Sequence, residues 1–217
     1  MRKPDVMLNG ISAADLGWLR ESISFPAPQS QTNTIVVPGR NSPVRYTGAL
    51  GRVSYQPRSF DITLSMLGYR VDFNKMADEA VNRFAGQLVN VILSEEPALY
   101  CVGTLEITPD YDPLTHKGQL ALSCTDGDAY RYHTEETEAV QGASGTVVLA
   151  NDFMPVIPVV TADAETTLKW QVGTDRFVKT VSSGTWTFPE LELGHGVNEI
   201  EVITDGTVTF RYREGRL

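Results

Sequence analysis

The stretch of the chain that most resembles a site for chemistry is TIVVPGRNSPVRYTGALG, from Thr34 to Gly51. Closely spaced glycines can present backbone N–H groups to a phosphate at the start of a helix. Here Gly39 and Gly48 have the wrong spacing for a phosphate loop, and neither Gly48 nor Gly51 precedes Lys-Ser/Thr. Pro38-Gly39 instead fits the central positions of a type II turn, where Gly supplies the positive φ. We therefore predict a turn that joins extended segments.

Acidic and histidine side chains form no recognisable catalytic or metal-binding set. Glu95 and Glu96 are adjacent, so on a strand they point to opposite faces and cannot flank one glycosidic bond. Asp110 and Asp112 begin like a calcium loop, but Pro-Leu-Thr follows where the loop needs another Asp or Asn and then Gly. The three histidines lie far apart, and no G-x-S-x-G is present. We expect no catalytic residue, no metal, no cofactor and no enzymatic activity.

Aromatic side chains in the second half of the chain allow two interpretations. Trp170, Trp186 and Tyr212 are of the types that stack on sugar rings, so they are candidates for glycan stacking. Large aromatic residues also supply much of the buried area in β-sandwich cores. We favour the core and retain the glycan platform as the alternative.

Charge and composition exclude several classes of partner. The chain has 217 residues, a net charge of −9 and a globular composition with 41% hydrophobic residues. Residues 1–135 carry 12 Lys and Arg against 15 Asp and Glu, and residues 136–217 carry 6 against 12. Neither part has the positive excess that specific nucleic-acid binding requires. No apolar run approaches the about 18 residues of a membrane helix, and none follows the basic residues of MRKPDVMLNG, so we expect no membrane insertion and no signal peptide.

The two cysteines are too few for a disulfide scaffold or a zinc site. In a reducing cytoplasm Cys101 and Cys124 are expected to stay thiols. If PDYDPLTHKG closes a long hairpin, the two residues lie roughly opposite each other across it.

Strands dominate the pattern, with one helix among them. RSFDITLSML, GTLEITPDY and GQLALSC each alternate apolar and polar residues with the period of a strand. DFNKMADEAVNRFAG places its apolar residues on one helical stripe. Asp72 is the predicted N-cap and Gly86 the predicted residue after the C-terminus. The helix is expected to cover one face of a sheet.

A change in polarity divides the chain into two parts. RYHTEETEAVQGASG is acidic, ends in small residues and lacks clear periodicity, so we predict a linker at 136–145 between domains at 1–135 and 146–217. The second domain holds about seven short alternating segments, which is typical of a small β-sandwich. Asp205-Gly206 between two such segments is its strongest hairpin signal.

Several motifs of the first half follow one another in a fixed order and spacing: VMLNGIS, RESISFP, IVVPGRNSP, YQPRSFDITL, SEEPALYCVGTLEI and SCTDGDAYRY. The second half contains SSGTWTFPELELGHGVNEIEV and VTFRYREGRL. Taken together, the first set resembles the N-terminal domain, and the second set the C-terminal sandwich, of the distal tail proteins (Dit) of long-tailed siphophages. ALYCVGTL departs from the family, which usually has an aromatic-Gly-Arg type of strand there.

The resemblance implies a mainly β structural virion protein at the tip of a non-contractile tail, made and assembled in the bacterial host cytoplasm. An N-terminal β-sandwich with one flanking helix would build a ring of six subunits. That ring would join the tail-tube protein to the tail-associated hub or fibre protein. A galectin-like or carbohydrate-module-like C-terminal sandwich would project outward as a platform for a receptor-binding protein or a cell-surface glycan.

Three alternatives remain beside this interpretation: a tail-tube protein, a lectin-like glycan-binding module and an enzyme acting on cell-wall polysaccharide. For the opening stretch we expect a contact between subunits, because arginine suits bidentate contacts with a neighbour's carboxylates. The alternative is a solvated loop. The candidate contact residues are Pro38, Gly39, Arg40, Arg45 and Arg52.

Overall fold

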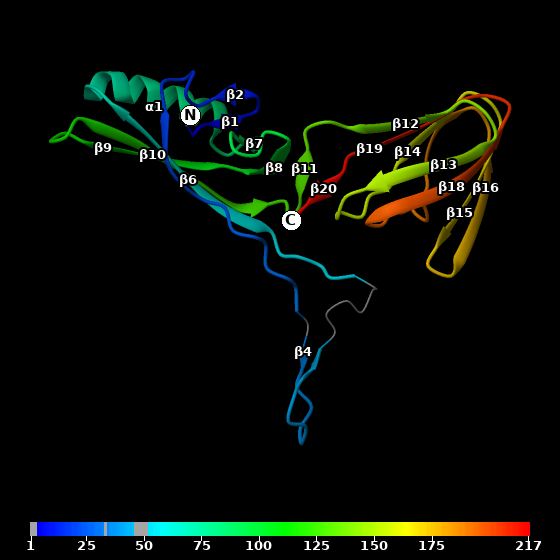
Figure 1. Ribbon diagram of the computed structural model, residues 1–217. Helices are drawn as coiled ribbons and strands as arrows, with labels where there is room; N and C mark the ends of the chain where they lie inside the picture. Colours follow the sequence, from blue (N-terminus) through cyan, green and yellow to red (C-terminus); the bar gives the residue numbers. More distant parts are fainter. Residues whose placement is uncertain (1–3, 33, 46–51) are drawn as a thin grey trace. The chain divides into compact units, whose positions relative to one another are not determined.

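The computed structural model describes residues 4–32, 34–45 and 52–217 (Figure 1). The chain divides into two compact units, Met1–Ala129 (unit 1) and Tyr130–Leu217 (unit 2). Antiparallel sheets build both units, and the described part of the chain contains one helix. The prediction of a mainly β chain with one helix is confirmed.

Unit 1 contains two four-stranded antiparallel arrangements and a small two-stranded ribbon. The first has the order β2 (Ile11–Ser12), β1 (Val6–Leu8), β7 (Leu88–Leu93) and β8 (Leu99–Thr104). The second has the order β3 (Leu19–Ser24), β6 (Arg58–Leu67), β10 (Lys117–Gly127) and β9 (Glu106–Asp112). The ribbon pairs β4 (Thr34–Ile35) with β5 (Val44–Arg45).

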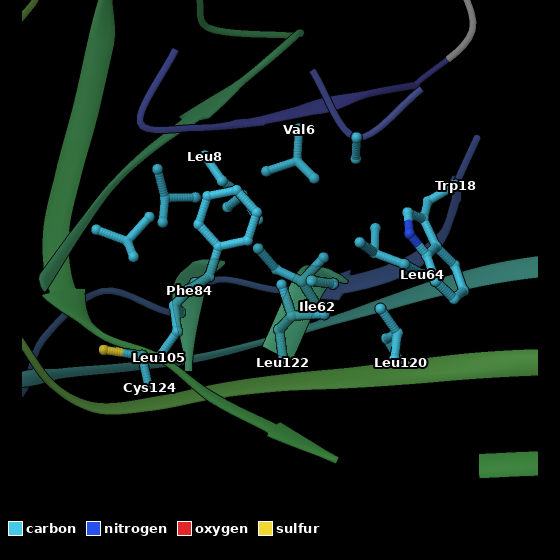
Figure 2. Packing of buried hydrophobic residues seen from close by; sticks show 14 of the residues in the cluster. Val6, Leu8, Trp18, Ile62, Leu64, Phe84, Leu105, Leu120, Leu122 and Cys124 are labelled. Carbon is cyan, nitrogen blue, oxygen red and sulfur yellow. The ribbon is translucent and has the colours of Figure 1, made fainter. Parts of the chain in front are cut away.

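Alternation along the central strands creates the core of unit 1. In β6 every second residue from Phe60 to Met66 is buried, and β10 pairs with it so that Leu64 lies opposite Leu120. Burial of these aliphatic side chains against the other sheet removes apolar surface from water, which is the main stabilising contribution. Figure 2 shows side chains of both sheets meeting the ring of Phe84 in this cluster.

The helix α1 (Arg70–Phe84) buries the predicted apolar stripe, with Phe73, Ala77, Ala80 and Phe84 facing the core. Gly86 adopts a φ of +66°, as predicted for the residue after a helix end. The predicted N-cap is wrong, because the helix begins earlier and Tyr69 occupies the cap without a side-chain hydrogen bond. Asp72 lies inside the first turn, where its charge favours the positive end of the helix dipole.

Unit 2 consists of two four-stranded antiparallel sheets and one short strand pair. One sheet has the order β12 (Thr137–Gln141), β19 (Val208–Tyr212), β14 (Val159–Ala162) and β17 (Gly184–Thr187). The other has the order β13 (Gly145–Asn151), β18 (Gly196–Thr204), β15 (Thr166–Val172) and β16 (Asp175–Val181). The pair joins β11 (Arg131–His133) to β20 (Gly215–Arg216).

The predicted sandwich of the second half is thus present, and its core takes side chains from both sheets. Leu149, Leu168 and Ile200 come from one sheet, and Val160 and Phe210 from the other. Each belongs to a strand whose neighbouring residues face solvent. The period-two pattern therefore predicts both the strands and their buried faces.

The predicted linker at 136–145 is wrong where Thr137–Gln141 forms β12 and pairs with β19. This strand alternates half-buried and exposed residues rather than buried and exposed ones. A strand that buries no large side chain gives little periodic signal in the sequence, which explains the error.

The turn at Asp205-Gly206 does not close a hairpin. β18 before it and β19 after it belong to different sheets, so the chain crosses the sandwich here. The glycine is required by packing, because a Cβ on Gly206 would lie 1.9 Å from Oδ1 of Asp163. That same oxygen accepts a hydrogen bond from the backbone N–H of Thr207 at 2.6 Å.

PDYDPLTHKG closes the predicted hairpin, since Asp112 of β9 pairs with Lys117 of β10. The hairpin does not extend to Cys101, which lies on β8 and pairs with Val91 of β7. Cys124 pairs with Phe60 of β6 in the other sheet. Both thiols are free and buried, so the expected placement across one hairpin is wrong.

Candidate functional site

The segment between β3 and β6, residues 26–57, forms an extended excursion that we call the arm. Near its base the backbone N–H of Gln31 donates to the carbonyl of Ser54, and that of Gln56 donates to the carbonyl of Gln29, both at 2.8 Å. Further along, β4 and β5 pair through Thr34 opposite Arg45 (Figure 1). The described part of the arm is therefore a narrow two-stranded ribbon.

The turn predicted from Pro38-Gly39 is present. The backbone N–H of Arg40 donates to the carbonyl of Val37 at 3.1 Å, and Gly39 has a φ of +84°. This combination defines a type II turn, in which a residue with a Cβ at the glycine position would be strained. The turn exposes Pro38, Gly39 and Arg40 together.

The other two predicted contact residues lie elsewhere on the arm. Arg45 lies on β5, away from the turn. Arg52 is exposed and precedes Tyr55, which forms an isolated β-bridge with Ser30. Gly48 and Gly51 of the opening stretch lie outside the described residues. The arm thus gathers three of the five candidates at one turn and spreads the other two.

Sequence reasoning missed the apolar surface of the arm. Ile35, Val36 and Val37 are 53%, 79% and 40% exposed, although aliphatic residues of this size are usually buried. The signal was available, because three consecutive β-branched residues point to alternating faces and a two-stranded ribbon covers neither face. Large exposed apolar runs of this kind mark interaction surfaces.

Arg58 anchors both ends of the arm to the core. Its guanidinium donates to the carbonyl of Pro26 at 2.6 Å and to the carbonyl of Ala129 at 3.0 Å, and it lies over the ring of Phe25 at 5.1 Å. The residue is 2% exposed, at the first position of β6. The arm therefore leaves unit 1 from a fixed base.

The glycan-stacking candidates do not form a platform. Trp170 is buried in the core, where its ring lies 5.5 Å from that of Phe177 and its N–H donates to the carbonyl of Glu190. Tyr212 is also buried and donates its hydroxyl to the carbonyl of Ala150. Trp186 alone of the three is exposed, on β17 of the other sheet from Trp170. Because the rings of Trp170 and Tyr212 are buried, the three residues cannot stack together on one sugar ligand.

A shallow groove of about 520 Å³ lies on the sheet β13-β18-β15-β16. Its rim combines donors and acceptors, and Lys169 pairs with Glu201 at 3.0 Å within it. Polar side chains exposed on neighbouring strands suit hydrogen bonding to a hydroxyl-rich ligand. The polar side chains that line it are Thr146, Lys169, Gln171, Arg176, Glu199 and Glu201.

Glu95, considered for catalysis, and Asp112, considered for a calcium loop, both have structural partners. The carboxylate of Glu95 accepts hydrogen bonds from both terminal nitrogens of the Arg20 guanidinium. These hydrogen bonds lower the pKa of the Glu95 carboxyl from 4.5 to about 2. Asp112 caps the β9–β10 turn by accepting from the backbone N–H of Leu114 and the hydroxyl of Thr115. Among the described residues no group of three His, Cys, Asp or Glu side chains could hold a metal ion.

In the part of the chain that the structure describes, no helix is long and apolar enough to cross a bilayer.

Comparison with known proteins identifies the fold. No family model matches the chain, and no curated protein matches it. The crystal structure of SPP1 Dit, described as a paradigm of the hub adsorption apparatus in phages that infect Gram-positive bacteria, matches this chain with a TM-score of 0.70. The match covers 100% of both chains at 14% sequence identity. The chain therefore has the fold of SPP1 Dit over its full length, as the sequence resemblance predicted.

Proposed function

We propose that this chain is a structural, non-enzymatic protein at the tip of a siphophage tail, where six copies form a ring. The observation that carries the proposal is the match to SPP1 Dit over both units, because a shared single sandwich would be far less specific. In this role the ring joins the tail-tube protein to the tail-associated hub or fibre protein.

The arm supplies a physical basis for ring formation. Its turn presents Arg40 beside an uncovered apolar run, and the buried Arg58 fixes its base. Arginine pairs well with carboxylates, and the chain as a whole carries a net charge of −9. We propose that Pro38, Gly39 and Arg40 contact a neighbouring copy, with Arg45 and Arg52 on the flanks of the same contact.

Negative-stain microscopy and light scattering of the purified chain test this proposal. We expect closed rings of six copies, alone or when the hub protein is added. Long tubes would instead favour the tail-tube alternative, and a chain that stays monomeric with the hub protein present would contradict ring formation.

Arg40→Ala tests the contact itself. We expect this variant to raise the concentration at which rings form by roughly tenfold, since a well-placed charged contact contributes about 1.4 kcal/mol. Arg176→Ala removes an exposed arginine from unit 2 and serves as the matched control. Unchanged assembly of Arg40→Ala would exclude the arm turn as a contact.

The groove on unit 2 favours glycan binding as a second candidate function. Its convergent donors and acceptors, rather than the aromatic residues, would hold a neutral oligosaccharide. Titration of the full chain with cell-wall oligosaccharides by NMR should shift the signals of Gln171 and Glu199, and Gln171→Ala should weaken binding. Absence of shifts at millimolar sugar would leave protein docking as the role of unit 2.

A further inference from the structure

A second uncovered apolar surface lies on unit 1, at the end of β6 away from the arm. Four large side chains there are between 71% and 90% exposed, and they come from the end of β6, the start of α1 and the β9–β10 turn. Exposed apolar residues that gather in this way mark interaction surfaces more often than single ones do. We call this surface the end patch; its residues are Leu67, Tyr69, Val71 and Leu114.

The backbone beneath the end patch is held in place by hydrogen bonds. The hydroxyl of Tyr111 donates to the carbonyl of Gly68 at 3.0 Å, and the N–H of Gly68 donates to the carbonyl of His116 at 3.0 Å. The ring of Tyr69 meets that of His116 edge-on at 5.7 Å. The β9–β10 turn and the β6–α1 connection are therefore joined, so binding here requires little ordering of the backbone.

Carboxylates border the end patch. Asp72 is exposed in the first turn of α1, and Asp110 and Asp112 are exposed on β9. Hydrogen bonds from Thr115 and Leu114 lower the pKa of Asp112, so its charge persists at neutral pH. Arg70 adds one positive charge, whereas Lys117 pairs with Glu21 at 2.7 Å. The border therefore favours a cationic partner beside the apolar centre.

The arm of the same chain begins at the opposite end of the strand that carries the patch. The arm enters β6 at Arg58, and the end patch starts at Leu67. Ten residues of strand separate these ends by about 30 Å. The two apolar surfaces therefore lie at opposite ends of one rigid element, which suits contact between copies better than contact within one chain.

We propose that the turn of the arm in one copy docks on the end patch of a second copy. Ile35, Val36 and Val37 then cover the patch, while Arg40 meets the bordering carboxylates. This inference rests on the proposed function and adds the surface that receives the arm. Because donor and acceptor surfaces differ, the contact is heterologous and repeats in one direction, which yields a ring when the rotation closes.

Complementation between two variants tests the docking. Val36→Asp disables the arm and Leu114→Asp disables the patch, and both residues are exposed, so folding is retained. Each variant alone is expected to lose ring assembly in sedimentation velocity. An equimolar mixture should form a one-to-one dimer and stop there, because one functional arm meets one functional patch. Val197→Asp, an exposed valine of unit 2, is the control and should assemble normally.

The outcomes separate this inference from the proposed function. Normal assembly of Leu114→Asp, with loss of assembly in Val36→Asp, would overturn the end patch and leave the arm contact standing. Failure of the mixture to dimerise would also overturn the docking. Normal assembly of both variants would overturn the docking and the arm contact together, while the fold match would remain.

Disulfide trapping tests the docking even when rings are too weak to isolate. A Val36→Cys chain mixed with a Leu114→Cys chain under copper-phenanthroline oxidation should give a covalent heterodimer, because two thiols lose their protons and two electrons to the oxidant. Native Cys101 and Cys124 are buried and do not compete. A Val197→Cys chain in place of Val36→Cys should give at least tenfold less, and equal yields would contradict the docking.

Discussion

At the scale of single residues, one buried cation joins three segments of unit 1. Arg58 binds carbonyls before and after it in the chain, those of Pro26 and Ala129. A buried charge that keeps its partners is tolerated, but removing the charge leaves those partners unsatisfied. In the sequence Arg58 resembles any polar residue at the start of a strand, so only the structure shows that it anchors the arm.

Arg58→Met should therefore lower the free energy of unfolding by about 1–3 kcal/mol, since the partly buried hydrogen bonds to the carbonyls of Pro26 and Ala129 are lost. Chemical denaturation followed by circular dichroism measures the change. Arg58→Lys should restore less than half of it, because one ammonium cannot span both carbonyls in the fixed geometry of a guanidinium. Full stability in Arg58→Met would show that the arm base is held by other contacts.

Gly118 allows the helix to pack on the sheet. A Cβ at this position would lie 2.1 Å from the ring of Phe73, so Gly118→Ala must displace α1 or rotate that ring. We expect a loss of about 1–3 kcal/mol in the free energy of unfolding. Gly142→Ala is the control, because a Cβ there meets nothing within 4 Å. Equal stability of the two variants would contradict the close packing.

The buried thiols should respond to alkaline pH. Burial raises the pKa of Cys101 to about 12 and that of Cys124 to about 11, from 9.0. The folded state thus favours the protonated thiols, so their stabilising contribution is complete below pH 9 and is lost as the pH rises toward 12. Iodoacetamide at pH 8 should modify neither thiol until the protein unfolds, and rapid labelling of the native chain would contradict this.

At the scale of elements, periodicity in the sequence predicts the helices and strands that bury one face and misses the strands that do not. The stripe of α1 and the alternation of β6 are visible because each buries one face. β12 buries no large side chain, so its sequence resembles a linker. The hairpin predicted at Asp205-Gly206 is wrong, because turn residues specify a local bend and not the sheet that the next strand joins.

The candidate site was predictable only in part. The type II turn followed from Pro38-Gly39, since its chemistry is local. The end patch was not predictable, because Leu67 and Leu114 come together through the pairing of β6, β9 and β10. Trp170 and Tyr212 resemble glycan-stacking residues by type, and only their burial shows otherwise.

The arm should be the first segment that proteases reach. Arg40 is exposed on a ribbon with few stabilising contacts, whereas the side chains of Arg20 and Arg58 are buried. Brief trypsin treatment of the unassembled chain should cut within the arm, after Arg40 or Arg52, giving N-terminal fragments that mass spectrometry identifies as 1–40 or 1–52. A first cut at Arg20 or Arg58 would contradict the anchoring of the arm base.

At the scale of the whole molecule, the described residues form two separate buried clusters, one in each unit. Each core is closed by its own pair of facing sheets. Fold similarity to SPP1 Dit persists over both units although only 14% of residues are identical. The two chains therefore share a fold although most of their residues differ.

Unit 2 should fold without unit 1, because its first and last strands close on each other. Arg131 of β11 pairs with Arg216 of β20, and Arg131 also donates to the terminal carbonyl of Leu217. Asp152 contacts both ends, at 3.0 Å from His133 and 2.9 Å from Arg216.

Residues 130–217 expressed alone should give dispersed NMR signals and a cooperative thermal transition. Residues 134–217, which lack β11, should unfold several degrees lower, since they lose these ties. Equal transition temperatures would show that β11 contributes nothing to unit 2, and a disordered 130–217 fragment would show that its core depends on the rest of the chain.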